Sequence, residues 1–128
     1  MNQATSLIAV FSGAGVGALC RYGLGNLVQK QSGSTFPWGT LAVNVSGCLL
    51  VGVVMALLLA KGGNDSIRTL LVTGVLGGYT TFSAFGYEAT NLLMTKVGDG
   101  LLYIAITNLL CLTSCFAGRL LALAFLKG

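Results

Sequence analysis

The sequence predicts an all-α membrane protein with four transmembrane helices. Hydrophobic residues make up 55% of the 128 residues and charged residues only 8%, with a mean hydropathy of +0.87. A soluble domain normally carries about a quarter charged residues. In addition, four apolar runs are long enough to cross the hydrocarbon core of a bilayer, which takes about 20 residues. These observations together indicate a chain that lies in lipid.

The four expected helices fill the chain, which we expect to form a single transmembrane domain over residues 1–128. They run over Leu7 to Val28, Gly39 to Ala60, Ile67 to Thr95 and Leu101 to Leu126. The first run is not expected to be a cleaved signal peptide, because MNQATS has no basic side chain and the run is as long as a full span. The connections are short and leave no room between the spans for a soluble domain.

The first and third expected helices each contain a pair of glycines four residues apart. These pairs are Gly13 with Gly17 and Gly74 with Gly78. Small residues at this spacing let helix backbones approach closely, either between two chains or within one chain. The sequence alone leaves both possibilities open. Four helices, each about 10 Å across, cannot enclose a pathway and still pack against each other, so we expect the chain to oligomerise.

The third expected helix contains a polar, glycine-rich segment, TGVLGGYTT, near its middle. Gly77 and Gly78, followed by Thr80 and Thr81, allow the backbone to leave the helix. Non-helical backbone at membrane depth occurs only where it is buried in protein or lines a polar cavity. We therefore expect a helix broken near the midplane, whose freed backbone groups form an ion site. A glycine kink that only improves packing is the alternative.

Uncharged groups suited to an anion surround the expected break. Phe82 and Phe85 share one helix face, where the positive ring edges can attract an anion; ordinary core packing is the alternative. Asn44 lies in the middle of the second expected helix. The fourth presents donors along one face at Tyr103, Thr107 and Cys111. Donors without fixed charge can replace the water around a small anion without trapping it.

Basic residues are divided almost evenly between the two ends of the expected bundle. One end collects Lys61, Arg68, Arg119 and Lys127, and the other collects Arg21, Lys30 and Lys96. Four against three is a very weak positive-inside signal. A chain with so little orientation bias can insert both ways and form an antiparallel homodimer, while a single orientation stays open.

The sequence carries no pattern typical of an enzyme or a nucleotide site. It has no His, and its only acids are Asp65, Glu88 and Asp99, so neither a nucleophile-base dyad nor a carboxylate pair can be assembled. Gly13, Gly15 and Ala18 match a loose dinucleotide motif but have no βαβ unit around them.

Four cysteines are spread over the first, second and fourth expected helices. They are Cys20, Cys48, Cys111 and Cys115. Cys111 and Cys115 are four apart and could meet a soft metal on one helix face, but no second pair has ligand spacing. We interpret the cysteines as small apolar fillers.

Three segments resemble the signature segments of the Fluc-type (CrcB-like) fluoride channels, small four-helix membrane proteins of bacteria. The segments are GALCR at 17–21, WGTLAVN at 38–44 and TGVLGGYTTFSAF at 73–85. The resemblance implies passive, fluoride-selective efflux through a multi-pass protein of the cell membrane. It also implies an antiparallel, dual-topology homodimer with two pores, in the lipid bilayer and without a nucleic-acid partner.

The resemblance also assigns roles by position. It places the carbonyls that bind a structural sodium ion, at the centre of the dimer, on Gly77 and Thr80. The expected fluoride pathway consists of Asn44, Thr81, Phe82, Ser83, Phe85, Tyr103, Thr107, Cys111 and Arg21. Arg21 matches an arginine that would make a vestibule electropositive; a membrane-interface anchor is the alternative. Ala84 and Cys111 stand where hydroxyl residues are common in the family.

A small proton-coupled multidrug exporter is the alternative function. Such an exporter needs a glutamate in its first helix, where this chain has Arg21 and no acid. Glu88 in the third helix is the remaining candidate, and we expect it instead to pair with a polar or basic neighbour. A non-transporting scaffold subunit would account for the small residues but not for the aligned donors.

Overall fold

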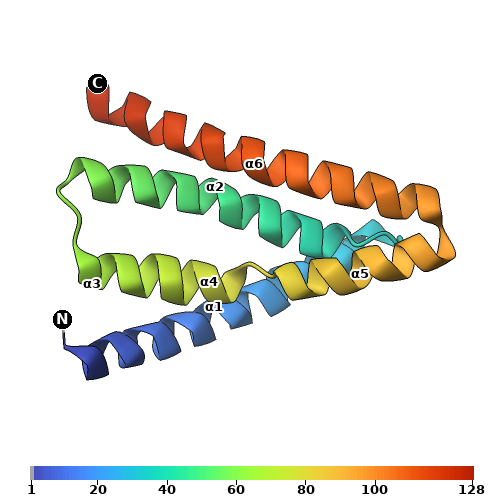
Figure 1. Cartoon of the computed structure of the whole chain (residues 1–128), viewed down its shortest axis with the longest axis horizontal. Coiled ribbons are helices and arrows are strands. Elements are labelled where there is room, and N and C mark those ends of the chain that lie inside the picture. The colour runs from blue at the N-terminus through green and yellow to red at the C-terminus, as the bar shows by residue number, and fades with distance from the viewer. Residues whose placement is uncertain (1) are drawn as a thin grey trace.

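The computed structural model describes residues 2–128, and its elements are helices. In chain order they are α1 (Gln3–Ser32), α2 (Trp38–Ala60), α3 (Asp65–Arg68), η1 (Thr69–Leu76), α4 (Gly77–Tyr79), α5 (Phe82–Thr95) and α6 (Val97–Lys127). The elements α3, η1, α4 and α5 follow one another along one line and make up a single rod, called here the third rod (Figure 1). The described residues therefore form four helical rods. The two ends of the chain lie at the same end of the bundle (Figure 1).

The first, second and fourth helices extend beyond the apolar runs that predicted them. Within residues 2–128, three helices are long and apolar enough to cross a membrane, and they are α1, α2 and α6. The third rod is divided into shorter pieces.

Polar side chains determine where α1 begins and how it connects to α2. The α1 helix starts after Asn2, whose side chain accepts a hydrogen bond from Thr5 N at 2.8 Å, and it ends at Gly33, which has a left-handed φ of 58°. Gln29 Oε1 accepts a hydrogen bond from Gly39 N at 3.0 Å. This contact fixes the end of α1 beside the start of α2.

Close backbone approach joins α1 to the third rod. A Cβ atom on Gly13 would lie 2.8 Å from Leu70 O, and one on Gly17 would overlap the backbone of η1. Gly74 and Gly78 approach α1 in the same way from the opposite side. In this structure both small-residue pairs therefore pack within one chain, which was one of the two possibilities that the sequence left open.

The third rod departs from α-helical geometry in two places, a π-helical segment and a short extended segment. Its Thr69–Leu76 segment is a π-helix, which is wider than an α-helix and is rare at this length. Thr80 (φ −81°, ψ 155°) and Thr81 (φ −146°, ψ 115°) then adopt extended conformations between α4 and α5. Thr81 Oγ1 accepts a hydrogen bond from Ala84 N at 3.2 Å and so caps the start of α5. The glycine-rich segment is thus followed by a two-residue interruption in the rod.

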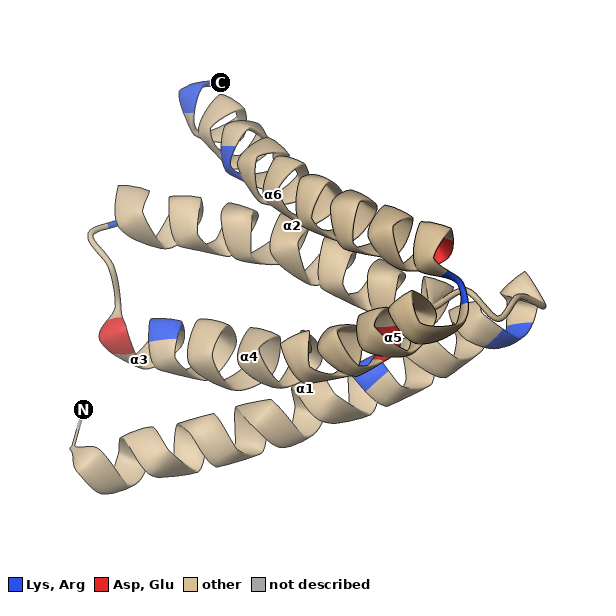
Figure 2. Cartoon of the chain, turned by 45° about the vertical axis from the view of Figure 1, so that its right-hand side comes forward, with Lys and Arg blue, Asp and Glu red and all other residues tan. Residues whose placement is uncertain are grey.

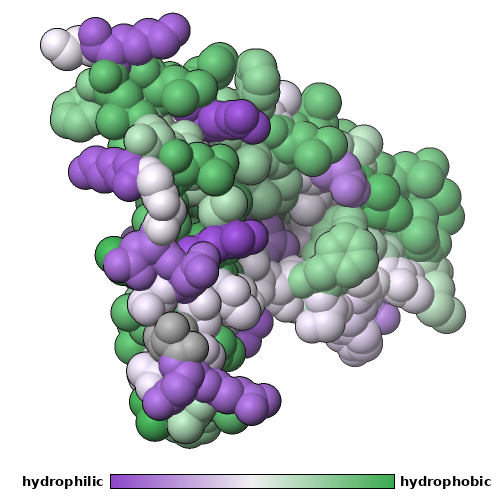
Figure 3. Space-filling view, turned by 60° about the vertical axis from the view of Figure 1, so that its left-hand side comes forward, coloured by the Kyte–Doolittle hydropathy of each residue, from purple (hydrophilic) through white to green (hydrophobic). Residues whose placement is uncertain are grey.

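The surface is apolar along the bundle and charged toward its ends. Lys, Arg, Asp and Glu lie mostly near the two ends of the bundle (Figure 2). Hydrophilic side chains gather at the end that carries both termini, next to broad apolar surface (Figure 3). Few apolar residues are buried, and one cluster of them consists of Leu41, Phe85, Ala89 and Tyr103. Most large apolar side chains therefore face outward, as expected for a protein in lipid.

Replacing Gly17 with Ala tests the contact between α1 and the third rod. Because the new methyl group overlaps the backbone of η1, we expect Gly17→Ala to lower the free energy of unfolding by about 2 kcal/mol. Gly15→Ala is the matched control, since its Cβ would meet nothing within 4 Å. Thermal unfolding in detergent measures both variants. Equal unfolding temperatures for the two variants would contradict the packing described here.

Candidate functional site

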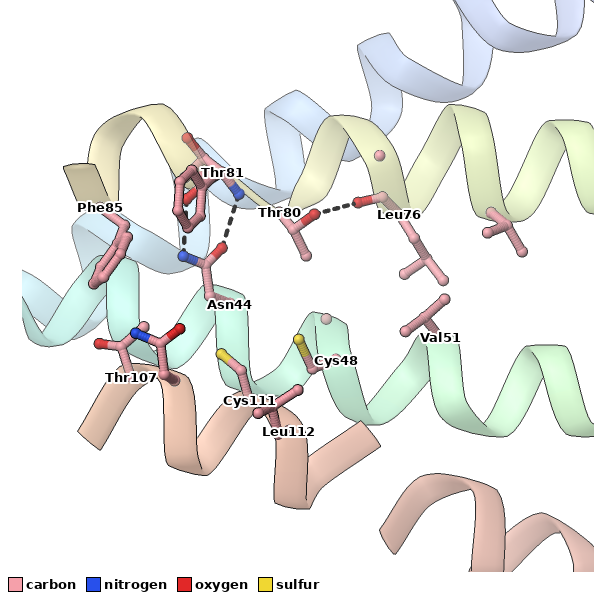
Figure 4. A pocket seen from close by; sticks show the side chains of 15 residues that line it. Asn44, Cys48, Val51, Leu76, Thr80, Thr81, Phe85, Thr107, Cys111 and Leu112 are labelled. Atoms are coloured by element: carbon pink, nitrogen blue, oxygen red, sulfur yellow. Dashed lines mark hydrogen bonds between the residues drawn. The ribbon is translucent and has the colours of Figure 1, made fainter. Parts of the chain in front are cut away.

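The interruption in the third rod is held by the side chain of Asn44 on α2. Asn44 Nδ2 donates to Thr81 O at 2.9 Å, and Thr81 N donates to Asn44 Oδ1 at 2.8 Å (Figure 4). Asn44 is only 7% exposed. One side-chain amide thus supplies a partner for the backbone N–H and another for the backbone C=O of Thr81. Leaving either group buried and unpaired would cost about 1–3 kcal/mol.

Two carbonyl groups beside the interruption lose their usual helical donors. Thr81 N–H donates to Asn44, so it is not available to Gly77 O four residues earlier. Ala84 N–H donates to Thr81 Oγ1, so Thr80 O loses its donor in the same way. Both carbonyl oxygens belong to the residues for which the sequence predicts a sodium ligand.

A cavity of about 360 Å³ lies between α2, the third rod and α6. It brings together most of the residues that the sequence predicts for an ion site, namely Asn44, Gly77, Thr80, Thr81, Phe82, Phe85, Thr107 and Cys111 (Figure 4). Apolar side chains such as Val51, Leu76 and Leu112 complete much of the wall. The charged side chains of the chain are not among those that line this cavity.

Thr107 provides an uncommitted polar atom in the wall of this cavity. The residue is 5% exposed, and its Oγ1 has no hydrogen-bond partner within residues 2–128. Other threonines on the helices, such as Thr113, bond to carbonyls of their own helix. A buried hydroxyl without a partner is costly, so an occupant of the cavity that accepts its hydrogen would be favoured.

The two predicted phenylalanines are neighbours with different exposure. Their ring centroids are 5.3 Å apart. Phe85 is 6% exposed and belongs to the buried core, whereas Phe82 is 79% exposed. Both line the cavity, so Phe82 lies toward its open side and Phe85 toward its closed side.

Next to Phe85, a half-buried carboxylate connects the third rod to α2 and α6. The ring centroids of Phe85 and Tyr103 are 5.3 Å apart, and Tyr103 is 0% exposed. Tyr103 OH donates to Glu88 Oε2 at 2.8 Å, and Thr40 Oγ1 donates to Glu88 Oε1 at 2.7 Å. The prediction that Glu88 pairs with a polar neighbour is confirmed. Tyr103 is not among the residues that line the first cavity.

Sequence reasoning gave no place at the site to Thr40 or Glu88. Thr40 lies one helical turn before Asn44, and this spacing alone could have drawn attention to it. Glu88 lies three residues after Phe85 and seven after Thr81, so its helical register could also have drawn attention to it, whereas its hydrogen-bond partners come only from the tertiary contacts.

A second, wider cavity of about 850 Å³ lies on the other side of Thr81. Thr81 lines both cavities. The other predicted residues here are Arg21 and Ser83, and Glu88 also faces this space. The structure therefore separates Arg21 from the uncharged cavity and places it in a more polar one.

Four helical rods with apolar outer faces, and an interrupted rod beside an uncharged cavity with free polar groups, define a small multi-pass membrane protein of the channel or transporter class. The chain belongs to the CrcB-like family. The family model, described as "CrcB-like protein, Camphor Resistance (CrcB)", matches residues 8–119.

Several curated relatives are similar over most of the chain. A protein of Novosphingobium aromaticivorans is 44% identical over 119 residues, which cover 90% of this chain and 92% of the relative. One of Rhizobium meliloti is 41% identical over 88% of this chain and 91% of the relative. One of Thermus thermophilus is 46% identical over 75% of this chain and 78% of the relative. All three bear the name "Fluoride-specific ion channel FluC".

Substituting Asn44 tests whether its side chain holds the interruption. Asn44→Leu leaves the backbone N–H and C=O of Thr81 without their partner. We therefore expect the free energy of unfolding to fall by about 2–4 kcal/mol. Asn108→Leu is the control, because Asn108 is exposed and donates only to Ile104 O of its own helix. Chemical unfolding in detergent compares the two. A loss of stability in Asn108→Leu as large as in Asn44→Leu would show that the paired amide has no special role.

Proposed function

We propose that this protein is a fluoride-selective channel that lets fluoride leave the cell passively through the cell membrane. The observation that carries the proposal is the buried, unpartnered Thr107 Oγ1 in a cavity without charged side chains. The names of the relatives support the same function. They do not favour the multidrug exporter, and they describe a channel rather than an enzyme.

The chemistry of the first cavity suits a small anion. A hydroxyl can donate a hydrogen bond to an anion, and the ring edges of Phe82 and Phe85 add positive potential without a formal charge. A fixed positive charge would bind an anion tightly and slow its release, whereas neutral donors allow it to move on. Fluoride is costly to dehydrate and therefore needs closely placed donors. In this cavity the uncommitted hydroxyl of Thr107 and the ring edges of Phe82 and Phe85 would supply such contacts.

We place the fluoride route through both cavities. Arg21 in the wider cavity would raise the local concentration of anions at the entrance. Thr81 lines both cavities, Ser83 lines the wider one, and Thr107 and Cys111 line the narrower one. Tyr103 lines neither cavity and would act on the route only through its ring contact with Phe85. Arg21 acts in this proposal as a vestibule residue rather than as a headgroup anchor.

We further propose that two chains form an antiparallel homodimer in which the interruption lies near the membrane midplane. The near-even division of basic residues between the two ends supports insertion in both orientations (Figure 2). The first cavity is open on the side of the exposed Phe82, where a second chain would close it.

A structural sodium ion fits the backbone at the proposed dimer centre. Hard cations take oxygen ligands, and Gly77 O and Thr80 O are both carbonyls without their usual helical donors. Each chain would supply this pair. The ion would hold the two interrupted rods together and take the place of the helical donors that these carbonyls have lost.

Glu88 does not support the exporter. Its two carboxylate oxygens each accept a hydrogen bond, from Thr40 and from Tyr103. Both acceptor oxygens are thus committed to neighbouring helices, whereas an exporter needs a carboxylate that is free to meet a cationic drug.

Fluoride release from liposomes tests the proposed function. Purified protein in liposomes loaded with potassium fluoride should release fluoride rapidly when a potassium ionophore sets a membrane potential, and chloride should be retained. A fluoride electrode records the release. Release that depends on a proton gradient, or no release of fluoride, would sink the proposal.

The same assay tests the role of Thr107. Thr107→Val removes the free donor while keeping the shape of the side chain, so we expect fluoride release to slow by about tenfold or more, as for loss of a hydrogen bond to a charged group. Thr113→Val is the matched control, because Thr113 Oγ1 bonds to Leu109 O of its own exposed helix face. Equal slowing in both variants would argue against a specific donor at Thr107.

Exchange of the cation tests the sodium proposal. In sodium-free buffer with N-methylglucamine, which is too large for two pairs of carbonyls, we expect the dimer in detergent to dissociate at a lower dilution than in sodium. Single-molecule photobleaching or analytical ultracentrifugation measures the dimer fraction. A fraction that is independent of sodium would contradict a structural ion at Gly77 and Thr80.

A further inference from the structure

Two cysteines from different helices meet in the wall of the first cavity. Cys48 on α2 and Cys111 on α6 both line it, and their thiols are neighbours that project into the same space (Figure 4). Both are free thiols and are partly exposed. Sequence spacing could not reveal this pair, because the two positions are 63 residues apart.

Close packing of α2 on α6 brings the pair together. A Cβ atom on Gly52 would overlap the carbonyl of Cys115, and one on Gly118 would overlap the carbonyl of Leu49. Backbones in such contact place facing side chains one turn away within reach of each other. The sequence neighbour of Cys111, Cys115, is not among the residues that line the cavity. The cysteines that share the cavity are therefore Cys48 and Cys111, on two different helices, and not Cys111 and Cys115, on one helix.

We propose that Cys48 and Cys111 form a binding site for one soft monovalent cation, Cu(I) or Ag(I). Within the described residues 2–128 no cluster of three or more His, Cys, Asp or Glu could hold a metal ion, so a four-ligand zinc site has no ligands. Two thiolate sulfurs suit a soft d¹⁰ monovalent cation, which accepts two ligands in line. The open cavity gives such an ion access to both sulfurs.

Binding changes the charge of the cavity. Both thiols give up their protons, two S–metal bonds form, and two protons leave to solvent, so the group that remains carries one net negative charge. Cys111 lies one turn from Thr107 on α6. A negative charge at this point repels an anion in the same cavity. The bound metal would therefore close the fluoride route; this consequence, unlike the metal site itself, rests on the proposed function.

Copper transfer to the purified full-length protein tests the site. Under anaerobic conditions the wild type should take one Cu(I) per chain from a coloured copper–bicinchoninate complex and release two protons. Cys48→Ala and Cys111→Ser should each take at least tenfold less at the same free Cu(I). Cys20→Ala and Cys115→Ala are controls that should bind as the wild type does. If the wild type takes up no Cu(I), the proposed site is wrong. It is also wrong if Cys115→Ala loses uptake while Cys48→Ala keeps it.

Fluoride release with and without Cu(I) tests closure. In liposomes we expect Cu(I) to slow release by the wild type and by Cys115→Ala at least tenfold, and by Cys48→Ala less than twofold relative to its own metal-free rate. Copper uptake without slower release overturns the closing role. If the wild type releases no fluoride even without metal, the proposed channel function fails, and copper uptake still decides whether the metal site exists.

Discussion

The rest of the site depends on two hydrogen bonds, which join the side-chain amide of Asn44 to the backbone N–H and C=O of Thr81. Backbone in a membrane can leave a helix only where its polar groups find other partners. Asn44 offers one donor and one acceptor in fixed geometry and brings no net charge. A carboxylate could only accept from the N–H of Thr81, a cationic side chain could only donate to its C=O, and either would place a fixed charge beside an anion route. A neutral amide satisfies both backbone groups and leaves the cavity uncharged.

Close packing elsewhere makes room for this cavity. Gly17 brings α1 into backbone contact with one side of the third rod, and Gly52 brings α2 into contact with α6. The space between α2, the third rod and α6 is then bounded by side chains of modest size, such as Val51 and Thr107. These glycines therefore stabilise the bundle by allowing two helix backbones to lie close together. In lipid this is the main source of helix association, because apolar surface gains little by leaving lipid for protein.

The two cavities differ in charge, and this difference orders the proposed route. Arg21 and Glu88 face the wider cavity, and Glu88 is held by hydrogen bonds from Thr40 and Tyr103. The narrower cavity has a free hydroxyl at Thr107 and the two thiols of Cys48 and Cys111. An anion moving inward would pass from a region that attracts it by charge to one that solvates it without charge. A soft metal bound by the thiols would reverse that character by adding a negative charge.

Composition and apolar run length determined that this chain is a four-helix membrane protein, because the cost of exposing peptide groups to lipid permits little else. Local chemistry also predicted the extended residues after Gly77 and Gly78, and the residues that gather around them. The pairing of Thr40 and Tyr103 with Glu88, the separate cavity at Arg21 and the meeting of Cys48 with Cys111 came only from the tertiary structure. Each joins residues far apart in the chain, and their contact depends on which helix faces pack together. Residue spacing along one helix carries no information about that choice.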